Sequence, residues 1–366
     1  MRNGKVSENV LIRSVLRKIK SRREEVICGA GIGIDCAVLS FGEGEETLCS
    51  TNPICAPTDR ICVYGIHRAL NNLAAAGAEP VGVLLSYMLP EGMEESILQD
   101  MMQQADTICA AHHVQIIGGH TEIAAGVREP VLTVTGVGKR KRGCQTEREN
   151  GRPGQDEKVS KMGIARPGQD EKISKMGIVR PGQDVVVSKW IGLEGSVRIA
   201  RECREALRRR YPERMIDEAA EFERFLSVIP EAATAVKSGV CGMHDVSQGG
   251  IFGALWELAE KAGVGLEIDL KKLPIRQETV ELCEFYDLNP YELLSGGALL
   301  MTTEDGTALV SALDKEGIPA VIAGRTTAGN DRVLYNGEEK RFLELPKADQ
   351  IYYLYQKKGK EKVWEQ

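Results

Sequence analysis

Aromatic residues are scarce in this sequence. They make up 5% of its 366 residues, so the hydrophobic cores must be built mainly from aliphatic side chains. The sequence also lacks an excess of positive charge: its formal net charge is −6, whereas a general nucleic-acid-binding protein would usually be basic. No apolar run approaches the ~20 residues that a membrane-spanning helix needs. We therefore expect a protein that binds neither nucleic acid nor a membrane.

The ten cysteines contain no C-x-x-C pair, and their spacing is irregular. The N-terminus runs directly into a charged helical pattern, so the sequence shows no signal peptide. We therefore expect reduced, mostly buried cysteines in a cytoplasmic protein. The length predicts about two domains, and the 42% content of hydrophobic residues is enough to form a core in each.

The first 145 residues alternate between strand patterns and helix patterns, which is typical of an α/β or α+β domain. The expected strands cover residues 47–50, 81–89, 114–117 and 131–137, and the expected helices cover 58–76 and 93–113. The second half repeats this alternation. We expect a second α/β domain at 180–346, ending in a hairpin that turns at Asn336-Gly337, and a tail or helix at 347–366.

A 14-residue repeat separates the two halves. Residues 152–165 are followed by a near copy at 166–179, and a diverged third copy begins at Arg180. Residues 139–184 hold twelve Lys or Arg and seven Asp or Glu, so this stretch carries +5 while the remainder carries −11. We interpret residues 146–179 as a duplicated arm, looped out at the domain junction. A basic arm that docks a partner is the alternative.

Glycine pairs next to polar residues mark several candidate sites. The apolar run at Ile116-Ile117 stops at Gly118-Gly119 and is followed by His120, Thr121 and Glu122. Two adjacent glycines allow a sharp turn and a close approach of a ligand to the backbone. We therefore expect a turn at the end of a strand, where α/β proteins often place chemistry. An ordinary turn with exposed polar groups explains the same pattern.

A glycine-rich loop at residues 29–33 precedes a single acid, Asp35. It is not a phosphate-binding loop of the Walker type, because no Gly-Lys-Ser/Thr follows. It is also a poor dinucleotide-binding fingerprint, because we expect no strand before the glycines and no helix after them. Asp35 is suited to hold a metal ion or to lie beside a phosphate. A loop aspartate that caps local amides is an equal alternative.

Two further candidate sites lie in the second half. The glycines at Gly192 and Gly195 open a helix, and a strand–glycine loop–helix start is a natural anion site. His244-Asp245 precedes Gly249-Gly250 at the start of another helix. A histidine with a pKa near neutrality is suited to proton transfer.

Taken in order, these landmarks resemble the AIR synthase (aminoimidazole ribonucleotide synthetase) superfamily, and most of all its HypE-like branch. The resemblance covers nearly the whole chain except the duplicated arm. The matching segments are the glycine-rich loop with Asp35, Thr51-Asn52-Pro53, the run from Asn71-Asn72 to Pro80, Ile117 to Thr121, Arg180 to Asp184, and His244 to Gly250.

The resemblance implies a two-domain fold. The N-terminal domains of a homodimer would pair into a β-barrel, the C-terminal domain would be a layered α/β unit, and ATP would lie in a cleft between the domains. The γ-phosphate would activate an oxygen of a small-molecule substrate. The implied metal ligands for Mg²⁺ are Asp35 and Glu122, and the implied catalytic residues are His120, His244 and Asp245. The implied ATP-binding residues are Gly33, Asn52, Asn72, Gly118, Gly119, Thr121, Gly192, Gly195, Gly249 and Gly250.

The sequence departs from the superfamily pattern at the expected metal site. Asn52, Asn72 and His120 stand where relatives usually or often have aspartate, and Mg²⁺ prefers anionic oxygens. The chain also ends in Glu365-Gln366 rather than in the cysteine that carbamoyl dehydration by HypE requires. Two hypotheses follow: an ATP-dependent enzyme acting on a metabolite, or a nucleotide- or partner-binding protein of the same fold that has lost catalysis.

Overall fold

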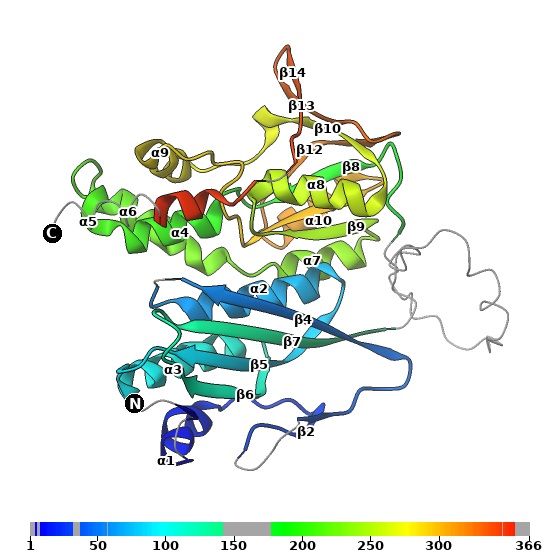
Figure 1. Cartoon of the computed structure of the whole chain (residues 1–366). Coiled ribbons are helices and arrows are strands. Elements are labelled where there is room, and N and C mark those ends of the chain that lie inside the picture. The colour runs from blue at the N-terminus through cyan, green and yellow to red at the C-terminus, as the bar shows by residue number, and fades with distance from the viewer. Residues whose placement is uncertain are drawn as a thin grey trace.

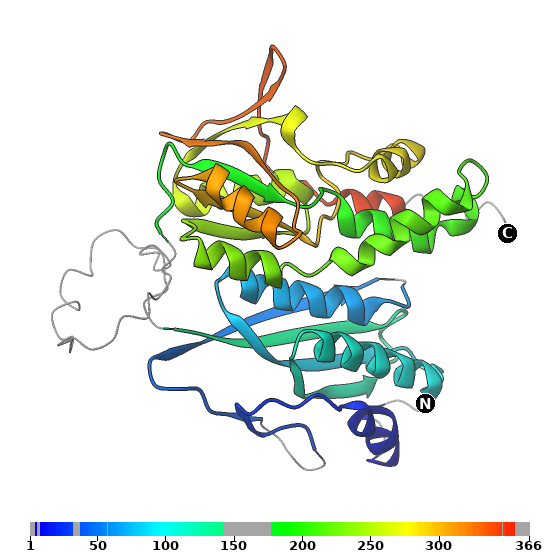
Figure 2. The same cartoon turned by 180° about the vertical axis from the view of Figure 1, so that it is seen from behind.

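The computed structural model of the chain describes residues 4–5, 8–31, 37–56, 58–141, 177–345 and 347–355. The predicted duplicated arm at 146–179 lies outside the described residues, except for its last three residues. Each half of the chain forms its own β-sheet, and helices lie between the two sheets (Figures 1 and 2). The protein is thus a two-domain α/β protein, as the sequence predicts.

The N-terminal domain contains a five-stranded sheet in the order β1–β6–β5–β7–β4. Strands β5 and β6 run parallel, and the other neighbours are antiparallel. The strands are β1 (Gly4–Lys5), β4 (Glu45–Cys55), β5 (Glu79–Leu89), β6 (Gln115–Ile123) and β7 (Val131–Lys141), with a separate pair formed by β2 (Val26–Cys28) and β3 (Val38–Leu39). The helical segments are α1 (Glu8–Val10), η1 (Leu11–Val15), η2 (Leu16–Lys18), α2 (Ile61–Ala75) and α3 (Glu95–Ala111).

The C-terminal domain contains a seven-stranded mixed sheet in the order β14–β13–β10–β12–β8–β11–β9. Its strands are β8 (Asp184–Ser188), β9 (Gly242–Val246), β10 (Gly265–Asp269), β11 (Ala298–Thr303), β12 (Ala320–Thr327), β13 (Arg332–Asn336) and β14 (Glu339–Phe342). Its helices are α4 (Leu193–Glu202), α5 (Arg204–Leu207), α6 (Glu213–Ala220), η3 (Glu221–Phe225), α7 (Ile229–Lys237), α8 (Gly250–Ala262), η4 (Leu270–Lys272), α9 (Gln277–Tyr286) and α10 (Gly306–Lys315). A last helical segment covers residues 350–355.

Helix α2 lies between the two domains (Figure 1). Of its fifteen residues thirteen are buried, because one side packs on β4 and β7 while the other meets the C-terminal domain. A Cβ at Gly65 would lie 3.1 Å from Val134 and 3.2 Å from Ile54, so this glycine lets the helix approach its own sheet closely. A helix that is apolar on nearly all sides is expected to be buried on all sides.

Polar contacts also join the domains along α2. The side chain of Asn71 donates to the carbonyl of Leu226 at 2.8 Å and accepts from the amide of Val228 at 2.9 Å. Arg68 pairs with Glu194 at 3.3 Å, and both side chains are buried. A buried polar group needs such partners to offset its desolvation. These bonds therefore fix how the C-terminal domain sits on α2.

Strand β6 corrects the prediction of a turn at Gly118-Gly119. The strand continues through both glycines to Ile123. The pairing with β5 shifts between Ile116 and Gly118, so Ile117 forms a β-bulge. A Cβ on Gly119 would lie 1.9 Å from the carbonyl oxygen of Leu85. The glycines therefore allow close pairing of two strands instead of a change in chain direction.

Other expectations from the sequence have mixed outcomes. The hairpin turning at Asn336-Gly337 is confirmed, with Gly337 at φ +69°. The expected absence of a strand before the glycine-rich loop is wrong, because β2 precedes Gly29. Strand β4 extends to Cys55 and so contains the Asn52 segment that we expected to follow it. In the part of the chain that the structure describes, no helix is long and apolar enough to cross a membrane.

The described cysteines are all free, and most are buried. This agrees with the expectation of reduced, mostly buried thiols. Two of them, Cys49 and Cys55, are instead exposed on the outer face of β4. The buried cysteines are Cys62, Cys109, Cys203, Cys241 and Cys283.

The substitution Gly119→Ala tests the packing of β6 on β5. We expect it to lower the free energy of unfolding by about 2–4 kcal/mol, because the added methyl collides with Leu85 and because φ at this residue is +147°. Urea unfolding monitored by circular dichroism measures the change. Gly126→Ala is the control, since a Cβ there meets open space. Equal stability of the two variants would contradict the interpretation.

Candidate functional site

A polar cluster joins the two domains beside α2. Ser50 and Asn52 lie two residues apart on β4, so their side chains share one face of the strand. With its amide oriented to satisfy its neighbours, Asn72 of α2 donates to both carboxylate oxygens of Asp245 at 2.9 Å. The oxygen of Asn72 then accepts from Asn52 Nδ2 at 3.1 Å and from Ser50 Oγ at 2.9 Å. Four side chains from β4, α2 and β9 thus form one hydrogen-bonded chain.

Asp245 is the only ionisable member of this cluster, and burial raises its pKa above the ordinary value. Its partner from the N-terminal domain is the neutral amide of Asn72. A neutral donor compensates a buried carboxylate less than a cation would. The cluster is therefore a place where a proton or a cation would be stabilised.

A small cavity adjoins the cluster at the domain interface. Arg68 and Tyr64 reach it from α2, and each carries a buried polar atom, Arg68 Nε and Tyr64 Oη, that has no hydrogen-bond partner within the described structure. Buried donors without partners are rare and call for an explanation. The cavity has a volume of only about 10 Å³, and it is lined by Tyr64, His67, Arg68, Asn71, Glu194, Leu226, Asp245, Ser247 and Gly296.

Of the predicted site residues, the structure brings together Asn52, Asn72 and Asp245. His244 does not join them. Successive side chains on β9 point to opposite faces of the sheet, and His244 Nε2 meets Glu257 Oε2 of α8 at 2.8 Å. Although His244 and Asp245 are adjacent in sequence, their side chains therefore lie on different faces of the sheet.

The residues around His120 lie on the other face of the N-terminal sheet. His120 Nε2 lies 3.2 Å from Glu122 Oε2, and both side chains are exposed. Thr121, between them, is buried on the helix-covered face. Gly118 and Gly119 lie within the same strand. The side chains of His120 and Glu122 are thus separated from the Asn72 cluster by the thickness of the sheet.

The predicted anion site at the start of α4 is already filled by protein groups. The amide of Gly192 donates to Ser295 Oγ at 2.6 Å, and the amide of Gly195 donates to the carbonyl of Leu294 at 2.8 Å. A Cβ at Gly195 would lie 2.4 Å from Leu293. These glycines therefore serve close packing, and their amides do not face an open site.

The start of α8 holds an anion supplied by the chain itself. The carboxylate of Asp349 accepts from the amide of Gly249 at 2.7 Å and from that of Leu294 at 3.2 Å. The amide of Gly250 donates to the carbonyl of Ser247 at 3.2 Å. Asp349 is buried, which raises its pKa to about 6. The helix start favours a negative charge as expected, but an internal side chain provides it.

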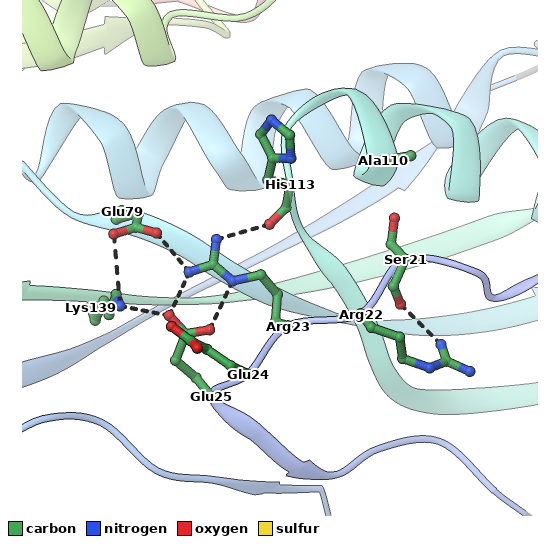
Figure 3. A pocket seen from close by; sticks show the side chains of 9 residues that line it. All are labelled: Ser21, Arg22, Arg23, Glu24, Glu25, Glu79, Ala110, His113 and Lys139. Carbon is green, nitrogen blue, oxygen red and sulfur yellow. Dashed lines mark hydrogen bonds and ion pairs between the residues drawn. The ribbon is translucent and has the colours of Figure 1, made fainter.

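The remaining predicted residues, Gly33 and Asp35, lie outside the described residues. Within the described ranges, no three or more His, Cys, Asp or Glu side chains are grouped to hold a metal ion. A larger hollow of about 570 Å³ lies beside residues 21–25, ahead of β2. Figure 3 shows that four of its charged groups pair with one another: Arg23 meets Glu25 and Glu79, and Lys139 meets Glu25 at 2.6 Å. This ion-pair network lowers the pKa of Glu25 to about 2.

Sequence analysis missed several residues at the domain interface. Arg68 interrupts an apolar helix, and Glu194 lies in the first turn of a helix of the other domain. A charge within such an apolar context was the available signal, but it does not identify the partner. Ser50 and Tyr64 carry no pattern at all, and Asp349 lies in a segment that we expected to be a tail or helix without a role in the site.

Fold and site together define a two-domain α/β protein with a polar cluster and a small cavity at the domain junction. The family model described as AIR synthase related protein, N-terminal domain, matches residues 33–139, and the corresponding C-terminal domain model matches residues 180–336. The chain belongs to the AIR synthase-related family, and within it to the HypE-like branch.

Individual relatives agree with this assignment. A putative hydrogenase expression/formation protein of Methanocaldococcus jannaschii is 24% identical over 95% of this chain and 96% of its own length. Carbamoyl dehydratase HypE of Rhodobacter capsulatus is 26% identical over 75% of this chain and 72% of its own length. A solved structure of the hydrogenase maturation protein HypE in complex with ATP has a TM-score of 0.71 at 18% identity, covering 95% and 97% of the two chains.

A double-mutant cycle tests the link between Asn72 and Asp245. We expect Asn72→Ala to lower the free energy of unfolding by about 1–3 kcal/mol, because it leaves a buried carboxylate without its donors. In the Asp245→Asn background the same change should cost at least about 1 kcal/mol less. Urea unfolding at pH 7 provides all four values. Strictly additive effects would show that the two side chains do not interact.

Proposed function

We propose that the protein binds ATP at the junction of its two domains and uses the γ-phosphate to activate an oxygen of a small metabolite. The observation that carries this proposal is the cluster of Asn52, Asn72 and Asp245, which three separate elements bring together at that junction. The family assignment supports it. The proposal is also consistent with the ATP complex of the similarly folded HypE.

The residues at the junction suggest a division of roles. The unpaired donors Arg68 Nε and Tyr64 Oη would bind phosphate oxygens. Asp245 would hold a proton or a cation. If the side-chain amide of Asn72 flipped, its oxygen would replace its nitrogen opposite the Asp245 carboxylate, at the distance of 2.9 Å that now separates the nitrogen from the carboxylate oxygens. The cavity volume of about 10 Å³ is far below that of usual ligand pockets, so the domains must separate to admit a nucleotide.

Mg²⁺ fits the described residues only in part. Asp245 would supply one carboxylate, and Asn52 and Asn72 would supply neutral amide oxygens. Mg²⁺ is commonly held by one or two carboxylates together with substrate phosphates. We therefore propose that any Mg²⁺ arrives with the nucleotide and is held largely by its phosphates. Such an ion would neutralise charge on the transferred phosphate.

The second candidate function is nucleotide or partner binding without catalysis. The amides of Asn52 and Asn72 favour it, because each stands where relatives usually carry an acid. The placement of His120 and His244 favours it too, since neither imidazole lies in the cluster with Asp245.

Calorimetry with ATP and Mg²⁺ tests the proposal. We expect wild-type protein to bind ATP and Asp245→Ala to bind it about tenfold more weakly or worse, because a charged ligand-holding group is lost. Asp314→Ala, an exposed aspartate on α10, is the control. Absence of ATP binding by wild type would overturn the proposal. Binding without turnover across a metabolite panel would favour the second candidate.

We further propose a homodimer in which the open faces of the N-terminal sheets meet to form a β-barrel. The face opposite α2 carries the exposed residues Cys49, Thr51 and Met88, the last with 44% of its surface accessible. An exposed apolar side chain on such a face is typical of an interface when similar residues surround it.

Sedimentation velocity tests this arrangement. We expect Met88→Glu to shift the dimer toward monomer by at least about tenfold in dissociation constant, because it buries a charge in the proposed interface. Ile97→Glu on α3 is the matched control, because Ile97 is similarly exposed at 42% but lies on a helix. A monomeric wild-type protein, or equal effects of both variants, would contradict the arrangement.

A further inference from the structure

A second hollow lies beside the β13–β14 hairpin. Its volume is about 550 Å³, and it is lined by Leu270, Lys271, Tyr291, Asn336, Glu339, Lys340 and Arg341. The hairpin projects from the end of the C-terminal domain that faces away from α2 (Figure 1). The hollow is therefore distinct from the domain junction. Nothing in the proposed ATP site depends on it.

Three of the lining side chains are cations that form no ion pair within the described ranges. No carboxylate of the described residues pairs with Lys271, Lys340 or Arg341, whereas Arg332 on the adjacent strand pairs with Glu260 at 2.5 Å. Glu344 lies near Arg341, but its carboxylate is held by Lys347 at 2.7 Å. The lining thus carries three positive charges against one negative charge, that of Glu339.

Neighbouring groups hold these cations in place. Arg341 lies over the ring of Phe252 at 5.6 Å, and Phe252 stacks on Tyr291 with ring centroids 5.1 Å apart and planes 6° apart. Lys340 Nζ lies over the ring of Phe342, 5.8 Å from its centroid. A guanidinium stacked on an aromatic ring keeps its N–H donors free in its own plane. Two of the cations are therefore partly ordered in advance.

We propose that this hollow is a binding site for a small, multiply charged phosphate compound. Lys271 and Lys340 would act as point charges, and Arg341 would donate two parallel hydrogen bonds to one phosphate. The side-chain amide of Asn336 adds a neutral donor to the lining. The size of the hollow is that of a small-molecule site, which favours a metabolite over a folded partner. A local excess of positive charge concentrates anions even on a protein that is acidic as a whole.

Calorimetric titration with inorganic pyrophosphate at low salt tests the site. The double variant Lys271→Ala/Arg341→Ala should bind at least about tenfold more weakly than wild type, because two charge-assisted hydrogen bonds are lost. Glu339→Gln should bind about threefold more tightly, because it removes the carboxylate from the lining. Lys272→Ala should stay within about twofold of wild type. Lys272 is the exposed neighbour on η4 and does not line the hollow.

Each outcome either supports or overturns pyrophosphate binding in the hollow. The expected pattern, with unchanged melting temperatures, supports the site. Equal binding by wild type and the double variant overturns it, and so does an equal loss on Lys272→Ala, which would indicate general attraction to surface charge. Loss of pyrophosphate binding in Asp245→Ala alone would place the anion at the domain junction and overturn the site as well. An ATP-binding defect confined to Asp245→Ala would leave it standing.

Discussion

The burial of α2 between two sheets is the constraint on which the rest of the structure depends. One helix supplies core side chains to both domains, and only two of its positions, His67 and Asn72, are partly exposed. Most polar side chains on α2 therefore find a partner in one domain or the other, whereas Tyr64 Oη and Arg68 Nε lack one within the described residues. Arg68, Asn71 and Asn72 do so at three successive points along the helix. The domain junction is polar where the helix turns these residues toward it.

This constraint also explains why the candidate site has its present form. A cluster that draws on β4, α2 and β9 exists only while both domains remain seated on the helix. Packing sets the geometry of this cluster. Its chemistry depends on which side chains that packing brings together. A neutral amide stabilises a buried carboxylate only modestly. A charged ligand would therefore strongly change the energy of this pair.

The sequence predicted the two-domain α/β fold and most elements, because long apolar periodic runs such as α2 depend little on distant contacts. It also singled out Asn52, Asn72 and Asp245, which the structure brings together, while their roles stay predictions. It failed where the choice of a residue is determined by a neighbouring strand. Gly118-Gly119 follows the local pattern of a turn, yet Gly119 is required because a Cβ there would collide with the carbonyl oxygen of Leu85. Likewise, adjacency in sequence suggested that His244 and Asp245 act together, whereas strand alternation separates them.

Asp349 has a consequence for where this domain ends. The family model for the C-terminal domain stops at residue 336, yet the amides of Gly249 and Leu294 take their acceptor from a carboxylate thirteen residues further on. The family model and the hydrogen bonding therefore draw different boundaries. The model covers only the part of the domain that it describes, whereas the physical unit extends until its last buried donor is satisfied. In this chain the segment beyond the last residue of the family model is part of the domain's own hydrogen bonding.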